Sequence, residues 1–128
     1  MNTLGMIAIV VDDYDLAISH YVNDLDFTLI EDTTLTPDKR WVVVAPSLQG
    51  ARVLLAKAVN EAQIAAIGNS TGGRVGFFLY TTSFTQTYES YKAKGIDFIE
   101  LPRQETYGRV VVFKDKFGNK WDLIERND

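Results

Sequence analysis

The sequence predicts an α+β fold made of two tandem βαβββ modules. With 128 residues, 46% of them hydrophobic and 23% charged, the chain suits one compact domain and excludes two independent ones. Strand-like and helix-like apolar spacings follow one another in the order strand, helix, strand, strand, strand. The pattern of Met6 to Tyr14 begins again 70 positions later, at Gly76 to Phe84. Copies of roughly 55 to 60 residues are too small to be stable alone, so we expect them to pair and share a core.

Module one is expected to span residues 1–58. Gly5 to Val11 is a short apolar run, typical of a strand buried on both faces. Asp12 or Asp13 can cap the following helix, whose apolar residues recur at helical spacing from Tyr14 to Leu25. Three further strands are predicted at Phe27 to Thr33, Arg40 to Ala45 and Arg52 to Lys57.

A linker of one helix and one loop is expected over residues 59–73. Asn60 and Gln63 have the spacing of a capping box, and Gly68 is a stop signal for the helix. The glycine-rich stretch 68–73 could suggest a phosphate-binding loop. A strand follows it instead of a helix, and the usual lysine is missing, so a plain linker is favoured.

Module two is expected to span residues 74–128 and to repeat the elements of module one. Asp26-Phe27 recurs as Asp97-Phe98, and Tyr21 recurs as Tyr91. Arg40 with its valine-rich strand recurs as Arg109-Val110-Val111-Val112, and Gly50 recurs as Gly118. The repeat therefore extends beyond the opening strands to the end of each module.

Composition excludes several classes of function. The chain has no cysteine, so disulfides, a thiol nucleophile and a thiolate zinc site drop out. Its net charge of −4 argues against a nucleic-acid partner. The longest apolar run, Met6 to Val11, is too short to cross a membrane, and the first residues lack the basic segment of a signal peptide. We therefore expect a soluble, cytoplasmic protein with no membrane partner.

Two patterns in this chain carry a resemblance to a known superfamily. The first is the stretch Asp12 to Phe27, and the second is Lys114-Asp115-Lys116-Phe117-Gly118-Asn119-Lys120-Trp121-Asp122-Leu123. Together with the tandem repeat, they resemble the vicinal oxygen chelate superfamily, which contains glyoxalases, bleomycin-resistance proteins and extradiol dioxygenases. The resemblance implies curled mixed sheets around a cleft. In the enzymes, a divalent metal lies between the modules, held by His, Gln or Glu.

The expected metal ligands of such enzymes are largely missing from this chain. The resemblance places them at Met6, Leu54, Gly76 and Asp122. Only Asp122 can bind a hard metal, and one carboxylate does not hold a catalytic ion. The single histidine, His20, belongs to the first helix, where we expect a surface or boundary position. The sequence thus predicts no cofactor and disfavours a divalent metal.

Strand alternation predicts which residues line the cleft. If Met6 faces it, so do Ala8 and Val10, while Phe78 and Tyr80 would face it from module two. Asp122 would bring Ile124 with it. A flat ligand could then stack on Phe78 or Tyr80 and pair with Asp122. The alternative is that Phe78 is a core residue and that Asp122 caps a loop or pairs with a lysine.

Three more residues are candidates for the site. Tyr107 could close the pocket and Arg109 could bind an anionic group, although edge-strand packing with a solvated guanidinium is favoured. Trp41 fits either a pocket wall or a dimer interface, and the apolar strand beside it slightly favours the interface. Because modules of this superfamily complete each other within or between chains, we expect a homodimer.

The favoured function is metal-independent binding of a small molecule, such as the sequestration of a cationic or aromatic compound. The alternative is an enzyme of the same superfamily, a lyase, isomerase or dioxygenase with an atypical metal site. A third hypothesis is a homodimeric accessory protein whose cleft no longer binds or converts a small molecule. The expected partners are therefore a small-molecule ligand and a second copy of the chain.

Overall fold

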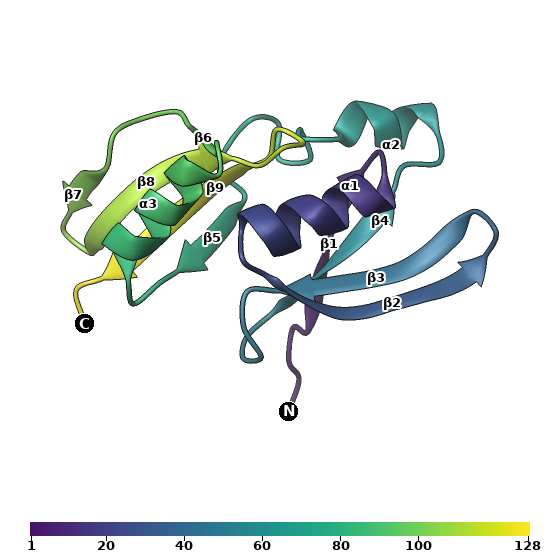
Figure 1. Cartoon of the computed structure of the whole chain (residues 1–128), viewed down its shortest axis with the longest axis horizontal. Helices are drawn as coiled ribbons and strands as arrows, with labels where there is room; N and C mark the ends of the chain where they lie inside the picture. The colour runs from purple at the N-terminus through teal and green to yellow at the C-terminus, as the bar shows by residue number, and fades with distance from the viewer. The chain divides into compact units, whose positions relative to one another are not determined.

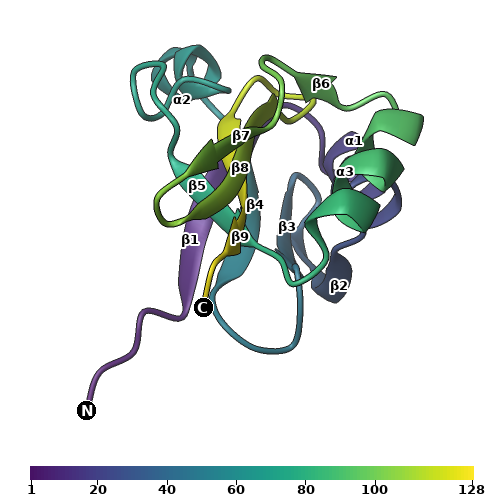
Figure 2. The same ribbon diagram turned by 90° about the vertical axis from the view of Figure 1, so that its left-hand side faces the viewer.

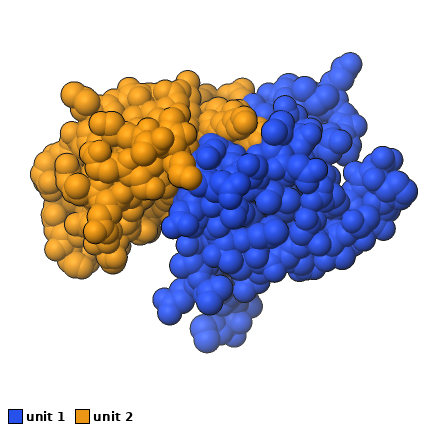
Figure 3. All heavy atoms as spheres, in the orientation of Figure 1, with its two compact units in different colours: residues 1–67 blue, residues 68–128 orange.

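The computed structural model describes all 128 residues and divides into two compact units, Met1–Ile67 and Gly68–Asp128 (Figure 3). Each unit holds one mixed sheet and is described by itself. The predicted α+β class with two mixed sheets is confirmed. No helix is long and apolar enough to cross a membrane.

The first unit has a four-stranded sheet in the order β1-β4-β3-β2 (Figure 1). Its elements are β1 (Met6–Val11), α1 (Tyr14–Ser19), η1 (His20–Asp24), β2 (Thr28–Thr36), β3 (Lys39–Ala45), β4 (Arg52–Lys57) and α2 (Glu61–Ala66). Strand β1 runs parallel to β4, whereas β3 runs antiparallel to both β2 and β4. The predicted element order is confirmed, and β2 extends three residues beyond the expected Thr33.

The first strand is buried on one face only, so the expectation of burial on both faces is wrong. Ile9 and Val11 are buried, whereas Ala8 is exposed and Met6 and Val10 are half-buried. Strand β1 lies at the edge of the sheet, and the side chains at alternate positions belong to different faces. The buried side joins the helix-covered core with Val42, Val44 and Leu55.

Both helix caps predicted in this unit are confirmed. The Asp13 carboxylate accepts a hydrogen bond from the Leu16 N–H at 2.9 Å and begins α1. The Asn60 side chain accepts one from the Gln63 N–H at 2.9 Å and begins α2. Gln63 in turn accepts from the N–H of Val59, at 2.9 Å. Helix α2 packs on β1 and so belongs to the first unit rather than to a separate linker.

The first helix continues from α1 into the π-helical turn η1, and this turn buries His20. The Leu25 N–H donates to the His20 carbonyl at 3.1 Å, which is the i→i+5 bond of a π-helix. His20 is 5% exposed, and its Nδ1 lies 2.9 Å from Asp24 Oδ2. The expected surface or boundary position of His20 is wrong, because the wider turn rotates this residue away from its place in an α-helix.

The second unit has a five-stranded sheet in the order β5-β9-β8-β6, with the short strand β7 also paired to β8 (Figure 2). Its elements are β5 (Phe77–Tyr80), α3 (Phe84–Ala93), β6 (Asp97–Phe98), β7 (Arg103–Glu105), β8 (Gly108–Lys114) and β9 (Lys120–Arg126). Helix α3 covers one face of this sheet. Tyr91 of α3 packs edge-on against Phe113, which stacks on Trp121. These aromatic rings form the core of the unit.

The strand that corresponds to β2 is interrupted in the second unit. Residues 99–102 separate β6 from β7, and they include Pro102, which has no N–H to donate. The Ile99 N–H still bonds the Val112 carbonyl, at 3.2 Å. The Val112 N–H is bonded by the Glu100 carboxylate instead, at 3.2 Å. The Glu100 side chain therefore provides the hydrogen-bond acceptor for β8 at the point where the neighbouring strand is interrupted.

Candidate functional site

The candidate site lies on the face of the second sheet that α3 does not cover, which we call the open face. The register pairs Phe78 with Asp122 and Tyr80 with Ile124. Trp121 and Leu123, the alternate residues, belong to the aromatic and apolar core. Phe78 is 53% exposed and Tyr80 is 60% exposed, although both are large and apolar. The alternation predicted from sequence is therefore present, and Phe78 is not a core residue.

A buried turn within the Lys114 to Leu123 pattern sets the orientation of Asp122. The Asp115 carboxylate accepts hydrogen bonds from the backbone N–H groups of Phe117 and Asn119, each at 3.0 Å. It also accepts from the Trp121 indole N–H at 3.1 Å. Because the indole is held on the core side, the next residue, Asp122, is turned to the open face. This part of the family pattern therefore has a structural role, because Asp115 fixes the turn and the Trp121 ring.

Asp122 is an incompletely satisfied buried carboxylate. It is 8% exposed, and its Oδ1 atom has no hydrogen-bond partner. Burial raises the pKa of Asp122, an effect that Arg103 opposes and Glu100 reinforces. A buried acceptor without a partner costs free energy, about 1–3 kcal/mol in typical proteins. Asp122 forms no ion pair with a lysine or an arginine of the chain.

Arg103 is a cation of the open face that the sequence did not suggest. Its register partner is Val110, whose partner is Ile124, so Arg103 shares the open face with Tyr80. Its Nε donates to Glu100 at 3.0 Å and its Nη1 donates to Glu105 at 2.8 Å. Glu105 and then Glu100 raise the pKa of Arg103 above its usual range, with a smaller contribution from Tyr107. Only the register of β7 identifies this face, and sequence spacing does not give that register.

Arg109, the cation that the sequence suggested, lies on the other face of the sheet. Its guanidinium is 4.5 Å from the centroid of the Phe84 ring on α3. Its Nη1 donates to the Thr85 hydroxyl at 3.1 Å. Tyr107 lies in the turn before β8 and is 47% exposed. Of Tyr107 and Arg109, the two residues proposed for the pocket mouth, only Tyr107 is near Arg103.

In the first unit, the corresponding face is mainly apolar. Met6 is half-buried beside Arg52, and Leu54 lies between Ala8 and Val43. Trp41 is half-buried opposite Thr33 at the β2 side of the sheet. The alternation places Trp41 on the same face as Val43, away from Val42 and Val44, which face the core.

The residues at the expected metal positions do not fit a divalent metal. They are Met6, Leu54, Gly76 and Asp122, and no group of three or more His, Cys, Asp or Glu side chains could hold a metal ion. Asp122 offers one carboxylate, where a hard cation needs several oxygen or nitrogen donors. His20 is buried in the first helix beside Asp24. Of the four residues at the expected metal positions, Asp122 alone offers an oxygen donor from its side chain.

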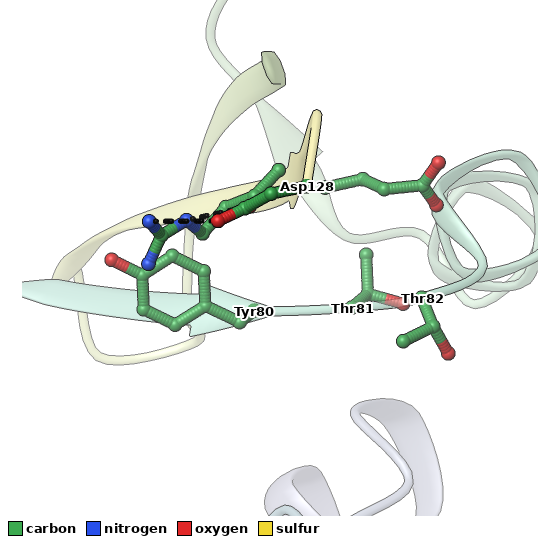
Figure 4. A pocket seen from close by; sticks show the side chains of 6 residues that line it. Tyr80, Thr81, Thr82 and Asp128 are labelled. Carbon is green, nitrogen blue, oxygen red and sulfur yellow. Dashed lines mark hydrogen bonds and ion pairs between the residues drawn. The ribbon is translucent and has the colours of Figure 1, made fainter. Parts of the chain in front are cut away.

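A cavity of about 400 Å³ adjoins Tyr80 at the end of the open face (Figure 4). Its lining residues are Tyr80, Thr81, Thr82, Glu125, Arg126 and Asp128. Figure 4 shows Tyr80 and the two threonines following one another along the wall. The Arg126 guanidinium lies 5.8 Å from the Tyr80 ring centroid, and its Nε is 3.3 Å from Asp128 Oδ1.

Comparison with known proteins agrees with this architecture. Residues 3–123 match the model of the Glyoxalase/Bleomycin resistance protein/Dioxygenase superfamily. An uncharacterized protein of Shewanella frigidimarina is 50% identical over 124 residues, covering 95% of this chain and 92% of its own. A superfamily member from Sphaerobacter thermophilus has a similar crystal structure, with 26% identity, a TM-score of 0.78 and 98% of each chain covered.

A further structural relative is TnmS3, described as an antibiotic binding protein from Streptomyces sp. CB03234. It has 21% identity and a TM-score of 0.80, and the match covers 99% of this chain and 98% of TnmS3. At this identity the likeness shows the fold alone. The family model, however, spans nearly the whole chain. This chain belongs to the Glyoxalase/Bleomycin resistance protein/Dioxygenase superfamily.

Proposed function

We propose that this protein binds a flat small molecule, aromatic and carrying a cationic or N–H donor group, without a metal. The observation that carries the proposal is the Asp122 Oδ1 atom, buried without a hydrogen-bond partner on the open face. A ligand donor placed there would supply the missing hydrogen bond. A charge-assisted hydrogen bond of this kind contributes about 1.5–3 kcal/mol.

The aromatic side chains beside Asp122 support the flat shape of the ligand. Phe78 is the register partner of Asp122, and Tyr80 lies two residues further along β5. More than half of each side chain is exposed, so both rings can stack on a ligand without rearrangement of the core. The carboxylate and the rings together would select a compound that is apolar across its faces and polar at one end.

The relatives support binding as a function of this fold. TnmS3, which shares the architecture, is described as an antibiotic binding protein. The donor set at the expected metal positions adds support, because Met6, Leu54 and Gly76 offer no nitrogen or oxygen side-chain ligand. These observations favour sequestration over the metal-dependent reactions of the superfamily.

An enzymatic role is the second candidate, and one observation favours it. Burial raises the pKa of Asp122, and a carboxyl group of this kind beside an accessible surface can act as a general acid or base. The same superfamily includes dioxygenases and glyoxalases, so the alternative is a lyase, isomerase or dioxygenase-type activity. Turnover of a bound compound that disappears in Asp122→Asn would favour this candidate.

The experiment for the binding proposal measures affinity and melting temperature together. Wild type is titrated by calorimetry with a panel of flat aromatic cations, including compounds with one, two or three fused rings. Asp122→Asn is expected to weaken binding by roughly 10- to 100-fold while the fold is kept. Glu89→Gln, at an exposed glutamate of α3 outside the open face, is the matched control and should bind like wild type.

Two results would contradict the binding proposal. The first is that no compound of the panel binds wild type at millimolar concentration. The second is that Asp122→Asn melts at a lower temperature but binds as tightly per folded molecule as wild type. In that second case the carboxylate supports the fold rather than the ligand.

A further inference from the structure

Strand β9 presents a second polar group on the open face, four residues beyond Asp122. Alternate side chains of a strand share a face, so Arg126 follows Asp122 and Ile124. The Cα atoms of Asp122 and Arg126 are about 13 Å apart by strand geometry. Tyr80 lies between them, because it pairs with Ile124 and its ring is under the Arg126 guanidinium. The two polar groups therefore flank one exposed aromatic ring.

The position beside Arg126 on the neighbouring strand is kept free of any side chain. Arg126 pairs with Gly108 of β8, which is buried and has a φ of +153°. A Cβ atom at this position would collide with the Glu125 carbonyl oxygen. Only glycine fits, so no side chain from β8 covers the guanidinium on that side.

Arg126 is held by one exposed ion pair and by its contact with the Tyr80 ring. Its side chain is 58% exposed and that of its partner Asp128 is 75% exposed, with Nε and Oδ1 3.3 Å apart and Nη2 and Oδ2 3.4 Å apart. Such surface pairs contribute about 0–1 kcal/mol. Arg103 on the same face differs, because Glu100 and Glu105 already occupy it at 3.0 and 2.8 Å. Arg126 is therefore the arginine of the open face that a ligand can recruit.

The cavity at this end of the open face provides space for part of a ligand. Its volume of about 400 Å³ is bordered by Tyr80 on one side and by Arg126 and Asp128 on another. Small-molecule pockets commonly start near this size. Glu125 also lines the cavity, but its carboxylate accepts the Phe84 N–H at 2.8 Å and caps α3. Arg126 is then the cationic group of the cavity, and it can bind an anionic acceptor.

We propose that the ligand lies along β9, with its flat body on Tyr80, and that Arg126 binds an anionic group at its far end. This inference rests on the binding function proposed above and narrows the ligand to an amphoteric aromatic compound. The cationic or donor end pairs with Asp122. The anionic end displaces Asp128 from Arg126 and occupies the cavity.

Two probes that differ in one group test this inference. Biphenyl-4-carboxamidine has two aromatic rings and one cationic end, and 4′-amidinobiphenyl-4-carboxylic acid adds a carboxylate at the opposite end. The second probe is expected to bind wild type roughly tenfold more tightly than the first, because of the charge-assisted contact with Arg126. Arg126→Gln should remove this difference. Asp128→Asn should enlarge it, since the competing carboxylate is gone.

Matched controls separate local effects from changes in total charge. Arg74→Gln removes an exposed arginine of the same unit that lies outside the open face, and it should leave the affinities of both probes unchanged. Glu89→Gln, at an exposed position of α3, serves the same purpose for Asp128→Asn. Melting temperatures of all variants are measured in parallel, and these exposed substitutions are expected to change them little.

The outcomes distinguish this inference from the binding proposal on which it rests. If Asp122→Asn weakens both probes but Arg126→Gln and Asp128→Asn leave their ratio at that of wild type, the role of Arg126 is wrong and the role of Asp122 stands. Equal affinities of the two probes for wild type overturn the inference in the same way. If neither probe binds wild type at millimolar concentration, both proposals fail for this ligand class.

Discussion

Two arginines at equivalent places in the repeat show how single residues hold each helix on its sheet. Arg40 lies 5.2 Å from the Tyr14 ring centroid and Arg109 lies 4.5 Å from that of Phe84, the first residues of α1 and α3. Each also bonds the next helix residue, Asp15 at 2.9 Å or Thr85 at 3.1 Å. This repeated contact gives both arginines a structural role, one that the recurrence of Arg40 as Arg109 reflects in the sequence.

The raised pKa of Asp122 predicts how stability depends on pH. Because burial raises this pKa above its unfolded value of 3.8, the folded state binds more protons than the unfolded state between the two values. The contribution of Asp122 to the stability of the wild type should therefore fall as the pH rises through this window and then level off. In Asp122→Asn this contribution is absent, so the variant should gain stability relative to wild type as the pH rises.

Urea unfolding of both proteins from about pH 3.5 to about pH 7 measures this difference directly. The free energy of unfolding of Asp122→Asn minus that of wild type is expected to increase with pH. A difference that stays constant, or that decreases with pH, would show that the Asp122 carboxylate is not penalised by burial. Asp97→Asn, at an exposed position, is the control for the general effect of removing one negative charge.

At the scale of elements, the periodicity of the sequence was a good guide to the fold. Strand alternation placed Phe78, Tyr80, Asp122 and Ile124 on one face, as the register now shows. Capping chemistry placed the start of α1 at Asp12 or Asp13, of which the structure shows Asp13, and the start of α2 at Asn60. These features depend on residues close together in the chain, for which local physical rules are sufficient.

Features set by distant parts of the chain could not be predicted in the same way. The π-helical turn that buries His20 depends on packing in the core, where Tyr21 is fully buried. The ion pairs of Arg103 with Glu100 and Glu105 depend on how β7 pairs with β8. The sequence does not specify the register of that pairing. Only the structure shows that Arg109 faces α3 whereas Arg103 faces Tyr80 and Asp122.

The break between β6 and β7 leads to a prediction about Glu100. Its Oε2 atom accepts both the Val112 N–H, at 3.2 Å, and the Arg103 Nε–H, at 3.0 Å. Glu100→Ala should lower the free energy of unfolding by about 1–3 kcal/mol, because it leaves the N–H of a buried strand residue unpaired. Glu100→Gln keeps an acceptor oxygen and should lose less.

Chemical denaturation measures this effect, with Glu89→Ala on the exposed side of α3 as the control. Hydrogen exchange at the Val112 amide adds a local readout, since its protection should fall in Glu100→Ala and be kept in Glu100→Gln. Equal stability and equal protection in Glu100→Ala and Glu100→Gln would contradict the idea that this side chain replaces a missing strand bond.

For the whole molecule, exposed strand edges and apolar side chains favour association with a second copy. Strand β2 is the edge of its sheet and is exposed along nearly its full length. A long unpaired edge is a place where another chain can add. Large apolar residues are also exposed in the second unit, including Phe78, Ile99 and Leu101 at 53%, 45% and 81%. Surfaces of this kind commonly mark interfaces.

We therefore predict a homodimer in which Trp41, on the face of β3 away from the first unit's core, lies at the interface. Light scattering should give twice the chain mass of 14.4 kDa. Trp41→Asp should shift the protein to the monomer with its circular dichroism kept, because Trp41 is only half-buried in one chain. Ser90→Asp is the control, since it adds the same charge at an exposed position on α3, away from β2 and β3. Wild type that remains a monomer at tens of micromolar would overturn the dimer, and Trp41→Asp that remains a dimer would move the interface away from this residue.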